Sequence, residues 1–154
     1  MNILIESPHN IEKEILIKLI DLIVAGGQVK RAYIEIGIKS ADLIAIIFDS
    51  DIIVSSATLK NPKTSYKKKV FDSANCSPLK SNSYKKELGY IVTNPDYESR
   101  GYSQKLLKHF LRSISNEKIF ATTRKPAMAH ILEKFNFIKA GKTYDGDLEL
   151  LLFN

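Results

Sequence analysis

Hydrophobic residues in the first third of the chain follow a helical period. Apolar residues recur every three or four positions across Ile11–Leu22, with charged residues between them, and this spacing predicts an amphipathic helix. Asn10 is expected to cap its start, and Gly26-Gly27 to end it through a left-handed residue. A weaker helical pattern covers residues 29–39, although its β-branched residues also allow a strand.

Strand-like patterns follow. Leu43–Phe48 and Ile52–Leu59 are rich in β-branched and apolar residues, and the polar turn Asp49–Asp51 between them predicts an antiparallel hairpin. The segment Asn61–Lys86 is rich in Lys, Ser, Asn and Pro, which predicts an excursion over the surface. One short helix is expected within it, at Ser65–Ala74.

In the second half, strands and helices alternate. One helix is expected to begin near Gly101 and another to cover Met128–Phe135, each with apolar residues on one face. The expected strands are Glu87–Thr93, Lys118–Thr123, Phe137–Lys142 and Asp147–Phe153. This order predicts a mixed sheet with helices on both faces, of the α+β (mixed α/β) class. With 154 residues, the chain is expected to form one domain over residues 1–154.

Composition and charge narrow the functional classes. The net charge of +6 favours anionic partners in general, including nucleotides and RNA. The densest basic stretch, Lys60–Lys69, has only Tyr66 and Phe71 nearby and lacks the regular aromatic interleaving of a single-strand binding surface. It predicts a solvated face, so nucleic acid binding is not favoured. Cys76 is the only cysteine, and no apolar run reaches the length of a membrane span, so cytoplasmic residence without membrane contact is expected.

No metal site is expected. His9, His109 and His130 are distant from one another in the sequence and have no ligand partners at metal-binding spacing.

The segment Tyr97–Ser103 is the candidate for chemistry. It leads from a predicted strand into a predicted helix, whose first N–H groups have no partner within the helix and suit a pyrophosphate. Gly101 lets the main chain approach an anion closely, and Ser103 keeps a crowded position small. Arg100 and Lys105 add positive charge.

This segment and its flanks resemble the acyl-CoA-binding motif of the GNAT superfamily. There, a strand ending in Pro-x-Tyr leads into Arg/Gln-x-x-Gly-x-Gly/Ala and a Leu-Leu helix, which corresponds here to Glu87–Tyr97, Glu98–Ser103 and Gln104–Leu107. Phe120–Phe137 resembles the strand, helix and "Leu-Gly-Phe" step that follow. The resemblance implies a GNAT-like fold with a twisted, largely antiparallel sheet of six to seven strands and about four helices.

The resemblance also implies acetyl-CoA as co-substrate. The implied cofactor-binding residues are Ile91, Val92, Thr93, Glu98, Ser99, Arg100, Gly101, Tyr102, Ser103 and Gln104. The strand Tyr90–Thr93 is expected to splay from Ile119–Thr123, which would let a backbone N–H near Val92 polarise the thioester carbonyl.

Several positions depart from the family pattern. Glu98 stands where Arg or Gln is usual, and Ser103 replaces the second Gly or Ala. Leu132 occupies the place of a tyrosine that protonates the departing thiolate in many members, and Asn136 occupies the place of a glycine. The usual general acid is therefore missing from its usual position.

Two residues are the candidates for proton transfer. Glu87 is the candidate general base, and the alternative is an exposed strand-end acid paired with Lys85 or Lys86. Tyr144 is the candidate general acid, ahead of Tyr90, and the alternative for both is a half-buried tyrosine at a strand end.

The predicted function is acetyl transfer from acetyl-CoA to a primary amine of a small molecule or peptide by direct attack. The lysine-rich segment argues against a polycationic acceptor. Two alternatives stay open: toxin-like acetylation of aminoacyl-tRNA, and a CoA-binding regulatory module without catalysis. Leu148–Phe153 would either complete the sheet of the monomer or pair across a homodimer.

Overall fold

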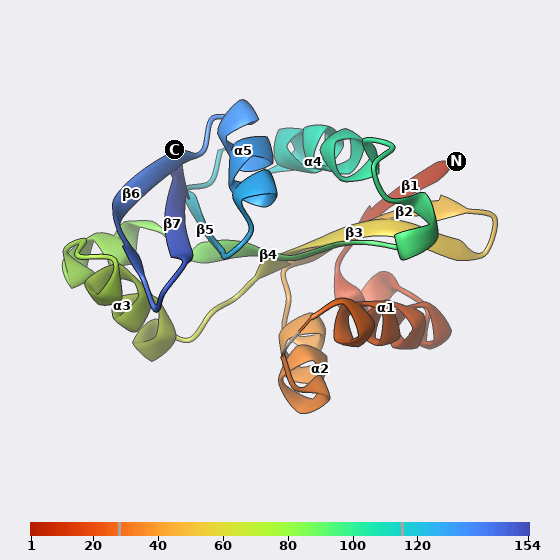
Figure 1. The fold of residues 1–154 in the computed structure, drawn as a ribbon. Helices are drawn as coiled ribbons and strands as arrows, with labels where there is room; N and C mark the ends of the chain where they lie inside the picture. Colours follow the sequence, from red (N-terminus) through yellow and green to blue (C-terminus); the bar gives the residue numbers. More distant parts are fainter. Residues whose placement is uncertain (28, 115) are drawn as a thin grey trace. The chain divides into compact units, whose positions relative to one another are not determined.

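The computed structural model describes residues 1–27, 29–114 and 116–154, and these form two compact units (Figure 1). Unit 1 comprises Met1–Asn61 and Leu88–Ser115, and unit 2 comprises Pro62–Glu87 and Asn116–Asn154. Seven strands form a sheet in the order β1-β2-β3-β4-β5-β7-β6. Of the pairings described, β4 with β5 is parallel and the others are antiparallel, which confirms the predicted α+β class with a mixed, largely antiparallel sheet.

The strands of unit 1 begin with one that the sequence patterns did not predict. β1 (Asn2–Glu6) pairs antiparallel with β2 (Leu43–Asp49), with Ile3 opposite Ile47. β2 then pairs with β3 (Ile52–Lys60), which confirms the predicted hairpin. The three apolar residues Ile3–Ile5 are consecutive and do not alternate with polar ones, so β1 is recognisable only through its pairing with β2.

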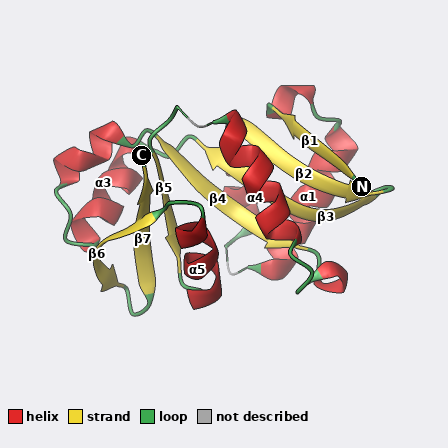
Figure 2. Cartoon of the chain, turned by 90° about the horizontal axis from the view of Figure 1, so that it is seen from above, coloured by secondary structure: helices red, strands yellow, loops and turns green. Residues whose placement is uncertain are grey.

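The helices of unit 1 cover both faces of these strands. α1 (Lys13–Gly26) and α2 (Arg31–Lys39) lie on one face, and α4 (Tyr102–Ser113) lies on the other (Figures 1 and 2). Consecutive residues of a strand point to opposite faces, so β2 is buried on both sides across Ile44–Ile47. These helices confirm the predicted pattern, and residues 31–39 are helical.

The first helix ends at Gly26 as predicted, but its predicted start and the predicted left-handed conformation at its end were wrong. Asn10 closes a short 3₁₀ helix (Pro8–Asn10), and α1 begins after Glu12. Pro8 at the start of that 3₁₀ turn pre-sets its φ and gives the chain a separate turn before the helix. At the other end, Gly27 is extended, with φ of −134°, and does not adopt the left-handed conformation.

Unit 2 contains the remaining elements. In chain order these are α3 (Thr64–Ser73), the 3₁₀ helix Pro78–Ser83, β5 (Ile119–Thr123), α5 (Pro126–Lys134), β6 (Ile138–Tyr144) and β7 (Leu148–Phe153). β4 (Lys86–Thr93) belongs to both units, and its first two residues pair with β5 through Lys86 opposite Ile119 and Glu87 opposite Phe120.

The segment Asn61–Lys86 is not a surface excursion, which corrects the prediction. α3 places Val70, Phe71 and Ala74 in the core of unit 2, where Phe71 packs edge-on against Phe120 with ring centroids 5.6 Å apart. Tyr84 is 3% exposed in the same core. The polar composition of the segment hid this core contact, because every third or fourth residue of α3 is buried while the residues between them face water.

The basic stretch is not wholly solvated either. Lys67 is 7% exposed, and its ammonium donates to the carbonyl of Ser81 at 3.4 Å. Burial, followed by the charges of Lys85 and Lys68, lowers the pKa of Lys67 below its ordinary value. The prediction of a lysine face open to solvent was therefore wrong at this position.

The C-terminal strand lies inside the sheet. β7 pairs with β5 on one side and with β6 on the other, so Leu148–Phe153 completes the sheet of its own chain. The edge strand is β6, whose register shifts between Ala140 and Tyr144 at Gly141, with φ of +66°. Such a bulge, together with exposed lysines, discourages pairing of an edge strand with another chain.

Candidate functional site

The loop between β4 and α4 is built from local turns and anchored to the β2–β3 hairpin. Asn94 accepts a hydrogen bond from the N–H of Asp96 at 3.0 Å, which caps the 3₁₀ helix η3 (Pro95–Tyr97). The Asn94 N–H donates to the carbonyl of Val54 at 2.8 Å. The polar break predicted at residues 94–96 is therefore a capped turn tied to β3.

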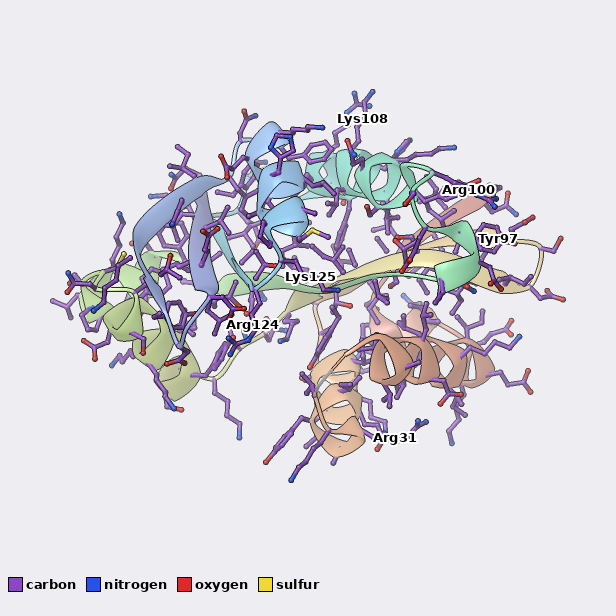
Figure 3. All side chains as sticks on the ribbon, in the orientation of Figure 1. Arg31, Tyr97, Arg100, Lys108, Arg124 and Lys125 are labelled. Carbon is purple, nitrogen blue, oxygen red and sulfur yellow. The ribbon has the colours of Figure 1, made fainter. Side chains whose placement is uncertain are left out.

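Tyr97 fixes the far end of this loop. Its hydroxyl donates to Asp49 at 2.8 Å, and this hydrogen bond is the main cause that raises the pKa of Tyr97. Tyr97 also meets Tyr102 edge-on, with ring centroids 6.0 Å apart, and the Arg100 guanidinium lies 5.6 Å from the Tyr97 ring centroid. Figure 3 shows Tyr97 and Arg100 at the same end of unit 1.

The backbone between η3 and α4 has the geometry of an anion site. Ser99 and Gly101 are left-handed, with φ of +61° and +78°, and α4 starts directly after Gly101. Left-handed residues in a turn aim successive N–H groups into one concavity, and the start of a helix adds a positive dipole. A side chain built at Gly101 would meet no other group within 4 Å, so the approach to the backbone is open.

The side chains of the loop fit a pyrophosphate only in part. Ser99 and Arg100 are exposed, and Tyr102, Ser103 and Gln104 are partly buried in the first turn of α4. Glu98 is also exposed, so its carboxylate can turn into water and away from a bound anion.

The strand portion of the predicted site, Ile91–Thr93, is partly buried at the end of β4. The carbonyl of Val92 accepts a hydrogen bond from Ser55, whose hydroxyl also lies 3.1 Å from that of Thr93. The Val92 side chain packs against the core formed with α1 and α2. The structure therefore shows how this strand end is held, and a role for the Val92 N–H in polarising a thioester stays a prediction.

In unit 2 the two predicted catalytic residues lie together. Glu87 is 3% exposed, which rules out the exposed strand-end alternative. Tyr144 is 9% exposed, and burial, followed by the negative charge of Glu87, raises the pKa of Tyr144 to about 12. A carboxylate and a tyrosine that stays protonated at neutral pH therefore share this part of the molecule.

A third residue, Tyr66 of α3, completes the group and was missed by the sequence analysis. Its hydroxyl donates to Oε2 of Glu87 at 2.9 Å. Burial, followed by the charge of Glu87, raises the pKa of Tyr66 above its ordinary value. Tyr66 precedes Glu87 by 21 residues, and no spacing rule links the two residues.

Other positions singled out in the sequence have structural roles. Tyr90 packs on the core of α1 and α2, and Lys60 lies over its ring at 4.3 Å. Leu132 is 1% exposed in the core of unit 2. Asn136 adopts φ of +71°, which explains why asparagine can stand where glycine is common, because asparagine tolerates the left-handed conformation.

Within residues 1–27, 29–114 and 116–154, no group of three or more His, Cys, Asp or Glu side chains is placed to hold a metal ion. In the same part of the chain, none of the helices has the length and hydropathy needed to span a membrane.

Comparison with known proteins gives a fold and no sequence family. Neither the models of protein families nor the curated proteins match this sequence. Among solved structures, ElaA of Escherichia coli superposes with a TM-score of 0.75 at 13% identity over 99% of both chains. An acyl-CoA N-acyltransferase of Pseudomonas aeruginosa gives 0.73 at 8% identity, again over 99% of both chains.

A third structure includes the co-substrate. A GNAT family acetyltransferase of Elizabethkingia anophelis with acetyl-CoA bound superposes with a TM-score of 0.66 at 12% identity, over 99% of this chain and 97% of that one. The chain therefore has the fold of the GNAT acetyltransferases.

Proposed function

We propose that this protein is a GNAT-type N-acetyltransferase that transfers an acetyl group from acetyl-CoA to a primary amine. The observation that carries the proposal is the turn before α4, where left-handed Ser99 and Gly101 open a backbone concavity at a helix start. Acetyl-CoA supplies an activated acetyl thioester and an anionic pyrophosphate. The turn suits the pyrophosphate, and Arg100 adds a positive charge beside it.

Glu87 and Tyr144 are proposed to move the protons. A free amine is mostly protonated near neutral pH and must lose a proton before it attacks. In this proposal Glu87 accepts that proton, directly or through a water molecule. The Tyr144 hydroxyl donates a proton to the departing thiolate, and its raised pKa, near 12, keeps that hydroxyl protonated at neutral pH.

The charge distribution supports a neutral or acidic amine as acceptor. Acidic and basic residues balance in unit 1, so the net charge of +6 comes from unit 2. A basic surface repels polycationic amines and favours acceptors that carry negative groups.

The direct test is calorimetric titration with acetyl-CoA of the wild type and of Gly101→Asp. Aspartate is among the side chains that tolerate a left-handed residue, and there is room for it here. Its charge would repel the pyrophosphate, and we expect the affinity to fall about tenfold or more. Gly101→Asn has nearly the same shape without the charge and should lose much less.

A second control separates strain from charge. Gly146, in the turn between β6 and β7, also has a positive φ, +89°, with open space around it. Gly146→Asp should leave acetyl-CoA binding unchanged. If the wild type does not bind acetyl-CoA, or if it binds but transfers no acetyl group to any amine of a broad panel, the proposed activity is wrong.

A further inference from the structure

The carboxylate of Glu87 is buried, so the protein must supply its hydrogen-bond donors. Glu87 is 3% exposed, and an ionised carboxylate away from water requires hydrogen-bond donors. Tyr66 supplies one, because its hydroxyl donates to Oε2 at 2.9 Å. A hydrogen bond to the charged form of an acid favours ionisation, and a base must be ionised to accept a proton.

The helix that carries Tyr66 is fixed on the strand pair that carries Glu87. Glu87 stands opposite Phe120 in the β4–β5 pairing, and Phe71 of α3 packs edge-on against Phe120 at 5.6 Å between centroids. Phe71 also contacts the ring of Tyr84, at 5.9 Å. The core of unit 2 therefore sets the position of α3, and with it the position of the Tyr66 hydroxyl.

Charged and titratable groups from several elements surround this hydrogen bond. Tyr66 approaches Glu87 from α3 and Tyr144 approaches it from β6, while Asp145 and Arg124 act on Tyr144. The raised pKa of Tyr66 means that it remains a donor throughout the pH range in which a carboxylate titrates.

We propose that Tyr66 is a positioning residue, whose hydroxyl holds the Glu87 carboxylate in the orientation that proton transfer needs. This inference rests on the proposed acetyltransferase function. It assigns a functional role to α3, the helix in the lysine-rich segment.

The test compares Tyr66→Phe with Tyr84→Phe in steady-state kinetics across pH. Both variants remove one tyrosine hydroxyl from unit 2, but that of Tyr84 donates to Asn154 at 2.6 Å and lies on no path to Glu87. For Tyr66→Phe we expect kcat to fall roughly tenfold, the KM for acetyl-CoA to stay unchanged, and the acidic limb of the kcat profile to move up by about one pH unit.

Tyr84→Phe should leave both kcat and the acidic limb at their wild-type values. An active wild type whose pH profile is unchanged by Tyr66→Phe would overturn the role of Tyr66 and leave the acetyltransferase proposal standing. A wild type that acetylates no amine would overturn both.

Discussion

The two units bury different kinds of side chains. The core cluster of unit 1 between the sheet and α1 and α2 consists of isoleucines and one leucine. The core of unit 2 is built around aromatic rings, including Phe71, Phe120 and two tyrosines. The buried charged residues of the described chain, Lys67 and Glu87, both belong to unit 2.

We infer from this difference that the two units have different roles in the proposed reaction. The isoleucine cluster of unit 1 packs densely against the sheet, so it suits a scaffold that presents the backbone loop before α4. A core containing tyrosines, a carboxylate and an ammonium costs desolvation, which is kept where shifted pKa values have a use. Variants of unit 1 should therefore alter acetyl-CoA binding, and variants of unit 2 should alter turnover and its pH dependence.

The largest effect is expected from Glu87→Gln in unit 2. Glutamine keeps the shape but cannot accept a proton, so kcat should fall about 100-fold or more. Calorimetry should give an acetyl-CoA affinity close to that of the wild type, because the loop at Ser99–Gly101 is untouched. A variant that turns over normally would remove Glu87 from the mechanism.

Tyr144→Phe should have the next largest effect, with kcat lowered roughly 10-fold to 100-fold. Since the pKa of Tyr144 is raised to about 12, its hydroxyl stays protonated below that pH, and the wild type should show no alkaline decline from this group between pH 7 and 10. Measurement of kcat against pH for both proteins checks this. A wild-type decline within that range that disappears in Tyr144→Phe would contradict the assignment.

In unit 1, Tyr97→Phe removes the hydrogen bond to Asp49 and should loosen the loop. We expect the KM for acetyl-CoA to rise several-fold, while the pH profile of kcat stays unchanged. Tyr33→Phe, on α2 with a 64% exposed side chain, is the control and should be neutral. A shifted pH profile in Tyr97→Phe would break the proposed division between the units.

The smallest effect concerns stability. Folding lowers the pKa of Lys67 below 10.5. Between the two pKa values the unfolded chain binds more protons than the folded chain, so the free energy of unfolding rises with pH across that window. Lys67→Met should abolish this rise and stabilise the protein by about 1 kcal/mol at pH 7. Urea unfolding at pH 7 and 9.5 measures both quantities, and exposed Lys69→Met should retain the pH dependence.

The sequence predicted most elements because their periods are strong. The helix after Gly101 and the β2–β3 hairpin follow from spacing and turn residues within a few positions. β1 was missed because its apolar residues, Ile3–Ile5, are consecutive and do not alternate with polar ones. The helix boundary at Asn10 was wrong because the start of an ordered helix depends on how the preceding proline turn packs.

The residues of the candidate region also divide into those that the sequence analysis singled out and those that it missed. The loop Tyr97–Ser103 was found from its residues, since a turn that opens a helix is a local structure and the glycine marks it. Tyr66 was not found, and the whole segment 61–86 was placed on the surface, because its composition is polar. Composition averages over a helix, whereas burial depends on which face meets the core.

By itself, then, the sequence determined the type and order of most elements and the turn that opens α4, because both depend on interactions between residues close along the chain. Only the tertiary structure decided that β7 is interior, that Lys67 is buried, and that Tyr66 and Tyr144 flank Glu87. These facts depend on contacts between residues that are not neighbours along the chain, such as Lys67 with Ser81 across 14 residues and Tyr66 with Glu87 across 21. Side-chain packing selects such contacts, and no local pattern encodes them.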